Sequence, residues 1–204
     1  SKRDAYVKQC GLETLYLIVT DQCNLRCRYC FINKGMPEGY ARKDMTWEVA
    51  KAGVDMFFAN VKNNPAVYDD MVKMIIFYGG EPFLNFPLIR RTVEYLKEAY
   101  RKEFEKLGDG FCFSIISNGT AITEEVALFI RDNPNITIAI SLDGPKEVHD
   151  KQRLTVGGTG SFDAAIRGYR LLTGIGGRKN VSVSCTIGSH NIDCLEEMLV
   201  MQKE

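Results

Sequence analysis

Short apolar runs alternate along the chain with longer segments in which apolar and polar residues are mixed. The runs are rich in Ile, Val and Phe and are bounded by glycine or polar residues, which is typical of buried parallel strands. This pattern predicts five strands: Leu15–Val19, Met74–Tyr78, Phe111–Ile116, Ile136–Leu142 and Val181–Ile187.

The segments between these runs carry the spacing and the end signals of helices. Capping residues, and a proline suited to a first helical turn, mark where the helices begin. The predicted helices run from a Thr46 cap to about Asn60, from Leu88 to Lys106 after Pro87, onward from a Thr123 cap, from a Ser161 cap to Leu172, and onward from the capping-box pair Asp193 and Glu196. One polar segment, Phe31–Met45, is longer than most connections and predicts a lid or substrate loop.

The alternation of strands and helices predicts an α/β fold. Five β/α units in series are expected to form a parallel sheet with helices outside it, curved as a partial TIM-like barrel. A doubly wound open sheet is the alternative, but no GxGxxG run follows the first predicted strand. In such sheets the active site lies at the carboxyl ends of the strands.

Polar or glycine-containing clusters follow all five predicted strands. Because the carboxyl ends of parallel strands lie at one edge of a sheet, we expect these clusters to share one rim. They are the cysteine-containing segment after Val19, then Gly79–Pro82, Ser117–Thr120, Ser141–Pro145 and Gly188–His190.

Composition narrows the class of protein. The 204 residues are 45% hydrophobic and 25% charged, with 26 basic and 26 acidic side chains, so no basic stripe indicates nucleic acid. No apolar run reaches membrane-spanning length, and no signal peptide is evident. Seven cysteines, three of them close together, favour a reducing cytoplasm over a disulfide scaffold. The chain starts at Ser1 and stops inside a predicted helix, so we expect a fragment of a longer protein.

The most informative motif is the spacing Cys23-x-x-x-Cys27-x-x-Cys30 directly after the first predicted strand. Three thiolates on one short loop can hold three irons of a [4Fe–4S] cluster, and full protein ligation would need a fourth cysteine. The spacing therefore predicts a cluster with one iron open to a ligand. Zinc is the alternative, because His149, His190 or another cysteine could complete a tetrahedral site.

This loop resembles the CxxxCxΦC signature of radical S-adenosylmethionine enzymes, with Tyr29 at the aromatic position. The resemblance implies that Cys23, Cys27 and Cys30 hold a [4Fe–4S] cluster. It also implies that the open iron binds the amino and carboxylate groups of S-adenosylmethionine. In that family, reduction of the cluster cleaves this cofactor to a 5′-deoxyadenosyl radical, which abstracts a hydrogen atom from the substrate.

The run Gly79-Gly80-Glu81-Pro82 resembles the GGE motif of the same family. The resemblance implies that the backbone of this run and the Glu81 carboxylate bind the methionine amino group. Glycine permits close approach of the backbone, and a carboxylate accepts hydrogen bonds from an ammonium group. Taken by itself, a Gly-Gly pair is more typical of a turn.

Four further residues are implied in cofactor binding. Asn118 and Ser141 match positions that contact the ribose and methionine parts of the cofactor, although each stands where a turn residue would serve as well. Asp143 follows at the end of the fourth predicted strand. Arg153 is implied as a partner of the cofactor carboxylate, since a guanidinium can bind a carboxylate with two bonds. A solvated surface arginine is the alternative for Arg153.

The other cysteines and the histidines carry weaker signals. Cys112 and Cys185 lie within predicted strands and are expected to be core residues, Cys194 is expected on a helix, and Cys10 is not placed. His149 and His190 are either proton carriers or surface histidines. No catalytic base is assigned from the sequence.

The resemblance is strongest to the subgroup with a C-terminal SPASM or twitch extension. This subgroup includes anaerobic sulfatase maturases and enzymes that crosslink ribosomally made peptides. The run Phe77–Asn85 resembles the thioether maturases of sactipeptide and ranthipeptide type. The family core has six β/α units and an extension follows it. We therefore expect residues 1–13 to be a lead-in and residues 14–204 to be an incomplete core.

The resemblance implies a peptide-modifying enzyme, with thioether crosslinking from a cysteine as the expected reaction. A formylglycine-forming sulfatase maturase and a carbon–carbon peptide cyclase are the alternatives within the family. A non-catalytic iron–sulfur or zinc module is the alternative from another class, although such a module needs no small-molecule pocket. The expected partners are a peptide or protein substrate and an external electron donor such as flavodoxin or ferredoxin, with no nucleic acid and no membrane.

Overall fold

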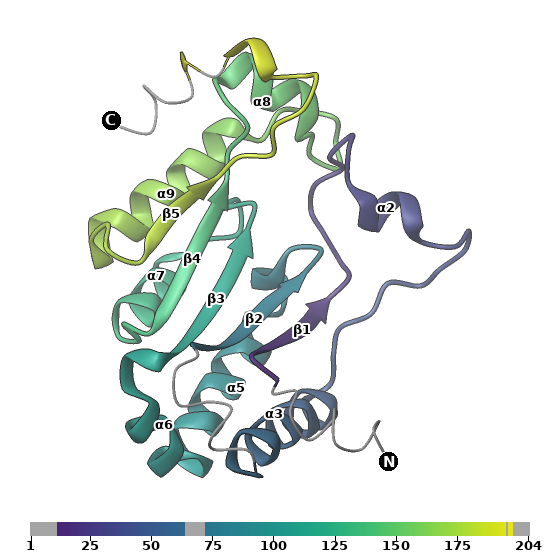
Figure 1. The fold of residues 1–204 in the computed structure, drawn as a ribbon. Coiled ribbons are helices and arrows are strands. Elements are labelled where there is room, and N and C mark those ends of the chain that lie inside the picture. The colour runs from purple at the N-terminus through teal and green to yellow at the C-terminus, as the bar shows by residue number, and fades with distance from the viewer. Residues whose placement is uncertain (1–11, 64–71, 195, 198–204) are drawn as a thin grey trace, which may run out of the picture.

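The computed structural model describes residues 12–63, 72–194 and 196–197, and a five-stranded parallel sheet forms its centre. Neighbouring strands pair in sequence order, so β1 and β5 are its edges within the described residues (Figure 1). The strands are β1 (Thr14–Thr20), β2 (Lys73–Gly79), β3 (Phe111–Ser117), β4 (Ile136–Ser141) and β5 (Val181–Ser184). The predicted partial barrel of five parallel units is confirmed.

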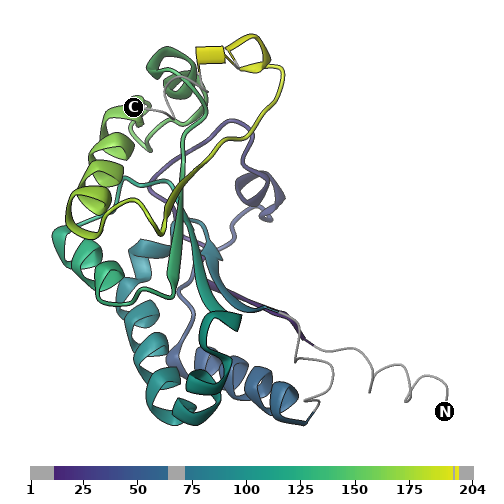
Figure 2. The ribbon, with the colours of Figure 1, turned by 60° about the vertical axis from the view of Figure 1, so that its left-hand side comes forward.

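Helices cover one face of the sheet and stand over its upper rim. The ribbons of α3, α5, α7 and α9 lie on one side of the curved sheet, and α2 and α8 lie beyond the carboxyl ends of the strands (Figures 1 and 2). The helices are α2 (Phe31–Gly35), α3 (Trp47–Asn63), α5 (Phe86–Ala99), α6 (Arg101–Leu107), α7 (Glu124–Arg131), α8 (Lys146–Gln152) and α9 (Phe162–Gly176), with short 3₁₀ turns η1 (Pro82–Asn85), η2 (Gly108–Gly110) and η3 (Ile192–Cys194).

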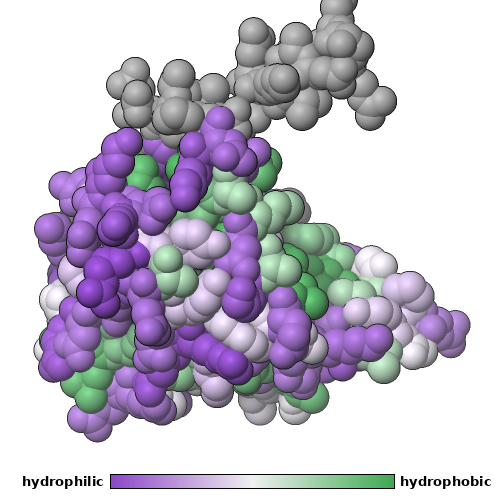
Figure 3. Space-filling view, turned by 90° about the horizontal axis from the view of Figure 1, so that it is seen from below, coloured by the Kyte–Doolittle hydropathy of each residue, from purple (hydrophilic) through white to green (hydrophobic). Residues whose placement is uncertain are grey.

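Alternation along the strands separates a buried face from an open one. Leu17, Val19 and Phe77 are buried with the other helix-facing side chains, each contributing about 1.5–3 kcal/mol by burial. On the opposite face Tyr16 is 60% exposed and Ile18 is 45% exposed. Seen from below, hydrophobic side chains gather in a hollow beside the largely hydrophilic surface (Figure 3). No helix among the described residues has the length and apolar character needed to cross a bilayer.

The last strand is shorter than predicted. β5 ends at Ser184 and not at Ile187, so Cys185 lies beyond the strand, contrary to the prediction. The backbone N–H of Thr186 donates to Asp143 Oδ1 at 3.1 Å, which takes the chain out of the ladder. The end of β5 is therefore set by a side chain of the neighbouring strand's loop.

The predicted helix over residues 88–106 is two helices. Tyr100 leaves the helical conformation at φ −118° between α5 and α6, while its ring stacks on Phe58 with centroids 4.5 Å apart. Its hydroxyl donates to Asp55 Oδ1 at 2.7 Å. Tertiary packing of Tyr100 thus overrides the local helical pattern.

The predicted helix cap at Thr123 is confirmed, and the one at Ser161 is wrong. Thr123 caps α7 as predicted, because its Oγ1 accepts a hydrogen bond from the Val126 N–H at 3.3 Å. Ser161 precedes α9 but makes no side-chain cap, contrary to the prediction. The helix predicted after Asp193 lies mostly outside the described residues, and the long polar loop after the cysteines contains the short helix α2.

Candidate functional site

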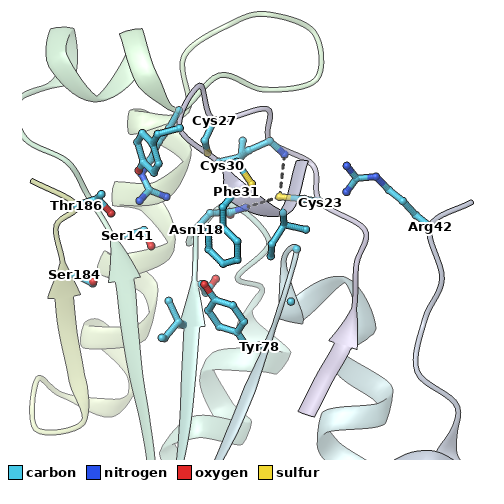
Figure 4. A pocket seen from close by; sticks show the side chains of 18 residues that line it. Cys23, Cys27, Cys30, Phe31, Arg42, Tyr78, Asn118, Ser141, Ser184 and Thr186 are labelled. Carbon is cyan, nitrogen blue, oxygen red and sulfur yellow. Dashed lines mark hydrogen bonds between the residues drawn. The ribbon is translucent and has the colours of Figure 1, made fainter. Parts of the chain in front are cut away.

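A cavity of about 500 Å³ lies at the carboxyl ends of the strands, a size typical of small-molecule sites. The ends of β2, β3, β4 and β5 and the loop after β1 contribute to its wall, and the three cysteines of that loop gather along one side (Figure 4). The sequence-predicted residues that line the cavity are Cys23, Cys27, Tyr29, Cys30, Gly79, Gly80, Asn118, Ser141 and Arg153. Glu81 and Asp143 are fully buried behind this wall. The common rim expected for the polar clusters is therefore present.

The cysteine loop is held by pairing with a distant segment. The Arg26 N–H donates to the carbonyl of Leu154 at 2.6 Å, and the Arg28 N–H donates to that of Gln152 at 2.9 Å. An antiparallel bridge joins Leu25 to Thr155. The loop between β1 and α2 thus runs antiparallel to the chain that leaves α8, which the sequence did not indicate.

Gly79 and Gly80 allow β2 to approach the cysteine loop. A Cβ on Gly79 would lie 2.0 Å from the Thr20 carbonyl oxygen, and one on Gly80 would lie 2.1 Å from that of Gln22. The Gly80 N–H donates to Thr20 at 2.9 Å, and the Glu81 N–H donates to Gln22 at 2.8 Å. Since Gly79 also has φ +140°, no side chain is tolerated where the two backbones meet.

The Glu81 carboxylate bonds to protein donors on both oxygens. Oε1 accepts from the Ser117 hydroxyl at 2.8 Å and from the Phe83 N–H at 3.2 Å, and Oε2 accepts from the Asn118 N–H at 2.7 Å. Burial raises the pKa of Glu81 to about 7, and these hydrogen bonds oppose the shift. In this arrangement the carboxylate joins the end of β2 to the end of β3.

Asn118 connects the end of β3 to the cysteine loop. Its amide nitrogen donates to Asn24 Oδ1 at 2.9 Å and lies 3.9 Å from the sulfur of Cys23. Its Oδ1 accepts from the backbone N–H and the hydroxyl of Thr120, at 2.9 and 2.7 Å. Asn118 is therefore both a turn residue, as one reading of the sequence suggested, and part of the cavity wall.

Asp143 is the centre of a buried polar network on the other side of the cavity. It accepts hydrogen bonds from Arg153 Nε at 2.8 Å and Nη2 at 3.2 Å, from the Thr186 N–H, and from the Tyr29 hydroxyl. Burial alone would raise the pKa of Asp143, but the Arg153 guanidinium overcomes this and holds it below the usual value. Arg153 is 8% exposed and not a solvated surface arginine.

Tyr29 lies between two side chains at the edge of this network. The Arg153 guanidinium is 5.4 Å from its ring centroid, and the His190 ring stacks on it at 5.5 Å with an interplanar angle of 19°. Burial raises the pKa of Tyr29, although Arg153 opposes the shift. The phenol is accordingly a neutral hydrogen-bond donor to Asp143.

His149 is fully buried and both of its ring nitrogens are engaged. Ser161 donates its hydroxyl proton to the carbonyl of Arg153 at 2.6 Å, so its oxygen accepts from His149 Nε2 at 3.0 Å. Nδ1 in turn accepts from the Asp143 N–H at 3.3 Å. Burial lowers the pKa of His149 to about 4, which favours this neutral form. Neither a surface position nor a proton-carrying role fits this residue.

Several cavity residues were missed in the sequence. They are Phe31, Arg42, Tyr78, Ser184 and Thr186, labelled in Figure 4. The period of two in strands could have placed Tyr78 and Ser184 on the open face. No local pattern marks Arg42, which donates from Nη1 to the Asp21 carbonyl at 2.5 Å.

None of the other described cysteines is among the residues that line the cavity, although Cys185 stands between Ser184 and Thr186, which do line it. Cys112 is half-buried in β3, Cys194 lies in η3, and Cys185 lies 3.6 Å from Asn191 Nδ2. Cys10 lies outside the described residues. No disulfide joins the cysteines that the structure describes.

The cysteine loop fits a negatively charged sulfur cluster. The Leu25 N–H donates to the sulfur of Cys23 at 3.4 Å, and the Asn118 amide approaches the same atom. Hydrogen bonds of this kind stabilise cluster sulfurs and tune their potential. Within the described ranges, no three His, Cys, Asp or Glu side chains surround a single point at metal-binding distance. A [4Fe–4S] cluster needs no such arrangement, because each cysteine binds a different iron.

The chain is similar in sequence to two proteins of stated activity and similar in fold to a solved structure. The cysteine-type anaerobic sulfatase-maturating enzyme of Clostridium novyi is 30% identical over 79% of this chain and 40% of its own length. The radical SAM cyclopropyl synthase TigE of Paramaledivibacter caminithermalis is 25% identical over 79% of the chain and 33% of its own length. The solved structure of anSMEcpe with bound AdoMet and Cp18Cys peptide aligns with a TM-score of 0.75 and 23% identity, over 95% of this chain and 48% of that one.

The chain spans less than half the length of each of these relatives. The profile of the Radical SAM superfamily matches residues 17–201, which is most of the chain. Members of this superfamily use a [4Fe–4S] cluster and S-adenosylmethionine. The chain therefore belongs to the Radical SAM superfamily.

Proposed function

We propose that Cys23, Cys27 and Cys30 bind a [4Fe–4S] cluster and that the enzyme uses it to cleave S-adenosylmethionine and modify a ribosomally made peptide. The observation that carries this proposal is the shared cavity, because the three thiols line the same space as the ends of β2, β3, β4 and β5. An electron carrier needs a cluster but no cavity of about 500 Å³ beside it. The cavity therefore favours an enzyme over a non-catalytic module.

We propose that the cofactor contacts those of the predicted residues that line the cavity. Gly79 and Gly80 offer backbone groups, Asn118 and Ser141 offer hydrogen bonds, and Arg153 offers a cation next to the cysteine loop. When bound, the cluster and S-adenosylmethionine supply a radical able to abstract a hydrogen atom from a substrate. The chain's own residues bind, orient and shield these groups.

Glu81 and Asp143 would act through other residues and not by contacting the cofactor. Both carboxylates are fully buried and already accept hydrogen bonds from protein groups. Among the described residues, Oε2 of Glu81 accepts only the Asn118 N–H and has a further acceptor position, but Glu81 is fully buried behind the lining, so a methionine ammonium would reach it only if the cavity wall moved. We therefore propose positioning roles for Glu81 and Asp143.

A peptide substrate is proposed from the relatives and from the open sheet. TigE is a cyclopropyl synthase, and anSMEcpe is solved with a peptide bound. The open face of the sheet exposes Tyr16, Ile18 and Ile116, and in the described part of the chain its edge strands β1 and β5 do not pair with each other. An extended peptide can reach the rim across such a face more easily than through a closed barrel.

Thioether crosslinking from a peptide cysteine is the proposed reaction, resting on the run Phe77–Asn85. Cysteine-to-formylglycine conversion is the second candidate, favoured by the 30% identity to the Clostridium novyi enzyme. Carbon–carbon cyclisation is the third, supported by the similarity to TigE. Residues 14–204 are proposed to be the core of this enzyme, with residues 1–13 leading into it and an external electron donor reducing the cluster.

The cluster is tested by anaerobic reconstitution with iron and sulfide, followed by Mössbauer analysis. We expect about four irons at a site with three cysteine ligands. Replacing all three cysteines by Ala should remove that signal. A stoichiometric, redox-silent zinc bound to the parent would contradict the proposal.

The reaction is tested with the full-length enzyme, a reductant and a cysteine-containing peptide encoded beside it. Thioether formation breaks an S–H and a C–H bond, so the peptide loses two hydrogens and one thiol stops reacting with an alkylating reagent. Carbon–carbon cyclisation loses two hydrogens and leaves the thiol reactive. Formylglycine formation removes the cysteine sulfur. Cofactor cleavage without any change in peptide mass would contradict all three of these reactions for that peptide.

A further inference from the structure

Cys27 lies directly across from Arg153. The hydrogen bonds from the Arg26 and Arg28 N–H groups go to the carbonyls of Leu154 and Gln152, the two neighbours of Arg153. In an antiparallel pairing, the residue between two such donors stands opposite the residue between the two acceptors. Both Cys27 and Arg153 line the cavity.

The charge of Arg153 is compensated by one partner. Arg153 and Asp143 form an ion pair at 2.8 Å in which the Asp143 side chain has no exposed area and that of Arg153 is 9% exposed. Water screens such a pair poorly, so each charge acts strongly on its neighbours. The Tyr29 phenol donates to Asp143, and the neutral imidazole of His149 accepts from its backbone N–H. The other ionisable groups that interact with the pair are the thiols of Cys27 and Cys185, the Tyr78 phenol and the buried Glu81 carboxyl group.

The same pair fixes the position of the cysteine loop. The Tyr29 hydroxyl, two residues after Cys27, donates to Asp143 Oδ2, and its ring packs on the Arg153 guanidinium. The Thr186 N–H also donates to Asp143, at 3.1 Å, and ties the pair to the segment after β5. Asp143 therefore joins the cysteine loop, the end of α8 and the end of β5 in one buried contact.

We propose that the Asp143–Arg153 ion pair is a positioning unit that holds Cys27 in place and sets the reduction potential of the cluster through its two opposite charges. This inference rests on the proposed cluster at Cys23, Cys27 and Cys30. Opposite charges at different distances from Cys27 do not cancel there, and the backbone pairing places Arg153, and not Asp143, opposite Cys27.

The two charges predict shifts of opposite sign. Reduction adds one electron from an external donor to the cluster, so a nearby positive charge favours the reduced form and a negative charge disfavours it. Asp143→Asn leaves Arg153 uncompensated and should raise the potential. Arg153→Gln leaves Asp143 uncompensated and should lower it. The double variant restores neutrality and should return the potential toward that of the parent.

The test is a mediated redox titration of the reconstituted full-length protein, monitored by electron paramagnetic resonance. The signal absent from a variant with Cys23, Cys27 and Cys30 all replaced by Ala identifies the cluster in question. Arg153→Lys keeps the positive charge, so its reduction potential should stay close to that of the parent. The potential of Arg153→Gln should be lower. The exposed pair Arg131–Asp132 supplies the control, and neither Arg131→Gln nor Asp132→Asn should move the potential.

The outcomes separate this inference from the proposed function. A parent chain that binds no cluster at the three cysteines overturns both. The inference alone is overturned if the parent binds its cluster normally but Asp143→Asn and Arg153→Gln shift the reduction potential in the same direction, or leave it unchanged. If Asp143→Asn fails to retain its cluster, the Lys and Gln variants of Arg153 decide, and equal potentials for these two contradict the electrostatic role.

Discussion

The two sides of the cavity hold the cysteine loop by different physical means. On the β2 side, Gly80 and Glu81 continue a backbone ladder with Thr20 and Gln22, and steric fit decides the contact. On the β4 side, Asp143 and Arg153 hold the loop through buried charges and side-chain hydrogen bonds. The contacts on the β2 side should be lost when a substitution adds volume there. Those on the β4 side should be lost when a substitution changes a charge.

The largest effect is expected from Gly80→Ala on the β2 side. Its Cβ would lie 2.1 Å from the Gln22 carbonyl oxygen, and backbone cannot move aside as a flexible side chain can. We expect a loss of at least ~3 kcal/mol in the free energy of unfolding and no cluster after reconstitution. Urea unfolding and iron content measure the two effects.

Gly174→Ala is the matched control for this substitution. Gly174 lies in α9, and nothing lies within 4 Å of the Cβ it would gain. Alanine there should stabilise the protein by about 0.5–1 kcal/mol and leave iron content unchanged. Equal behaviour of the two variants would contradict the steric account of the β2 side.

The two sides should also respond to pH in opposite directions. The folded-state pKa of His149 is lowered to about 4, so its contribution to stability is present above pH 6.5 and is lost as pH falls toward 4. The folded-state pKa of Glu81 is raised to about 7, so its contribution is present below pH 4.5 and is lost as pH rises toward 7. Each effect is on the order of 3 kcal/mol.

Because the pH ranges in which His149 and Glu81 titrate overlap, the test compares the stability of each variant with that of the parent at each pH. His149→Gln cannot titrate, so its stability relative to the parent should improve as pH falls from 6.5 to 4. Glu81→Gln should improve relative to the parent as pH rises from 4.5 to 7. Urea midpoints between these limits measure both trends, and parallel profiles for the two variants would refute the assignment.

A smaller effect is expected from Tyr29→Phe on the β4 side. The change removes a hydrogen bond to the buried Asp143 carboxylate while keeping the ring on Arg153. Bonds to charged groups contribute about 1.5–3 kcal/mol, and the lower value is expected because Arg153 and Thr186 still donate to Asp143.

Tyr40→Phe is the control for Tyr29→Phe. The Tyr40 hydroxyl donates to Asp21 Oδ2 at 2.7 Å, but Tyr40 is 43% exposed. Water can replace that bond, so the loss should be about 0.5 kcal/mol. Thermal unfolding of both variants measures the difference, and an equal loss would mean that burial of the Asp143 network adds nothing.

The sequence predicted what local chemistry determines. The short apolar runs located both ends of β1 to β4 to within one residue, and the cysteine spacing identified residues that the fold brings to one cavity. The sequence also identified the glycine pair Gly79-Gly80. Glycine is needed there because the backbone of Thr20 and Gln22 approaches closely, and not only to let a ligand approach.

Contacts between distant segments could not be predicted in the same way. The pairing of the cysteine loop with Gln152–Thr155 joins two irregular segments that carry no periodic pattern. Ser161 reads as a helix cap, but its hydroxyl bonds to Arg153 and His149 in the fold. The partner of a polar side chain is a property of the assembled structure, so sequence reasoning assigned Asp143 and Arg153 to a cofactor and did not pair them.

The smallest effect is expected from two cysteines outside the loop, Cys112 near the start of β3 and Cys185 directly after β5. Cys112→Ala in β3 and Cys185→Ala after β5 should each leave iron content at the parent value, because neither residue lines the cavity with Cys23. Half-buried thiols cost little to remove, so each loss of stability should be ~1 kcal/mol or less. Iron and sulfide analysis after reconstitution checks the first expectation, and urea unfolding checks the second. Loss of one iron in either variant would show that a fourth cysteine reaches the cluster, and the iron proposed to be open to the cofactor would then be closed.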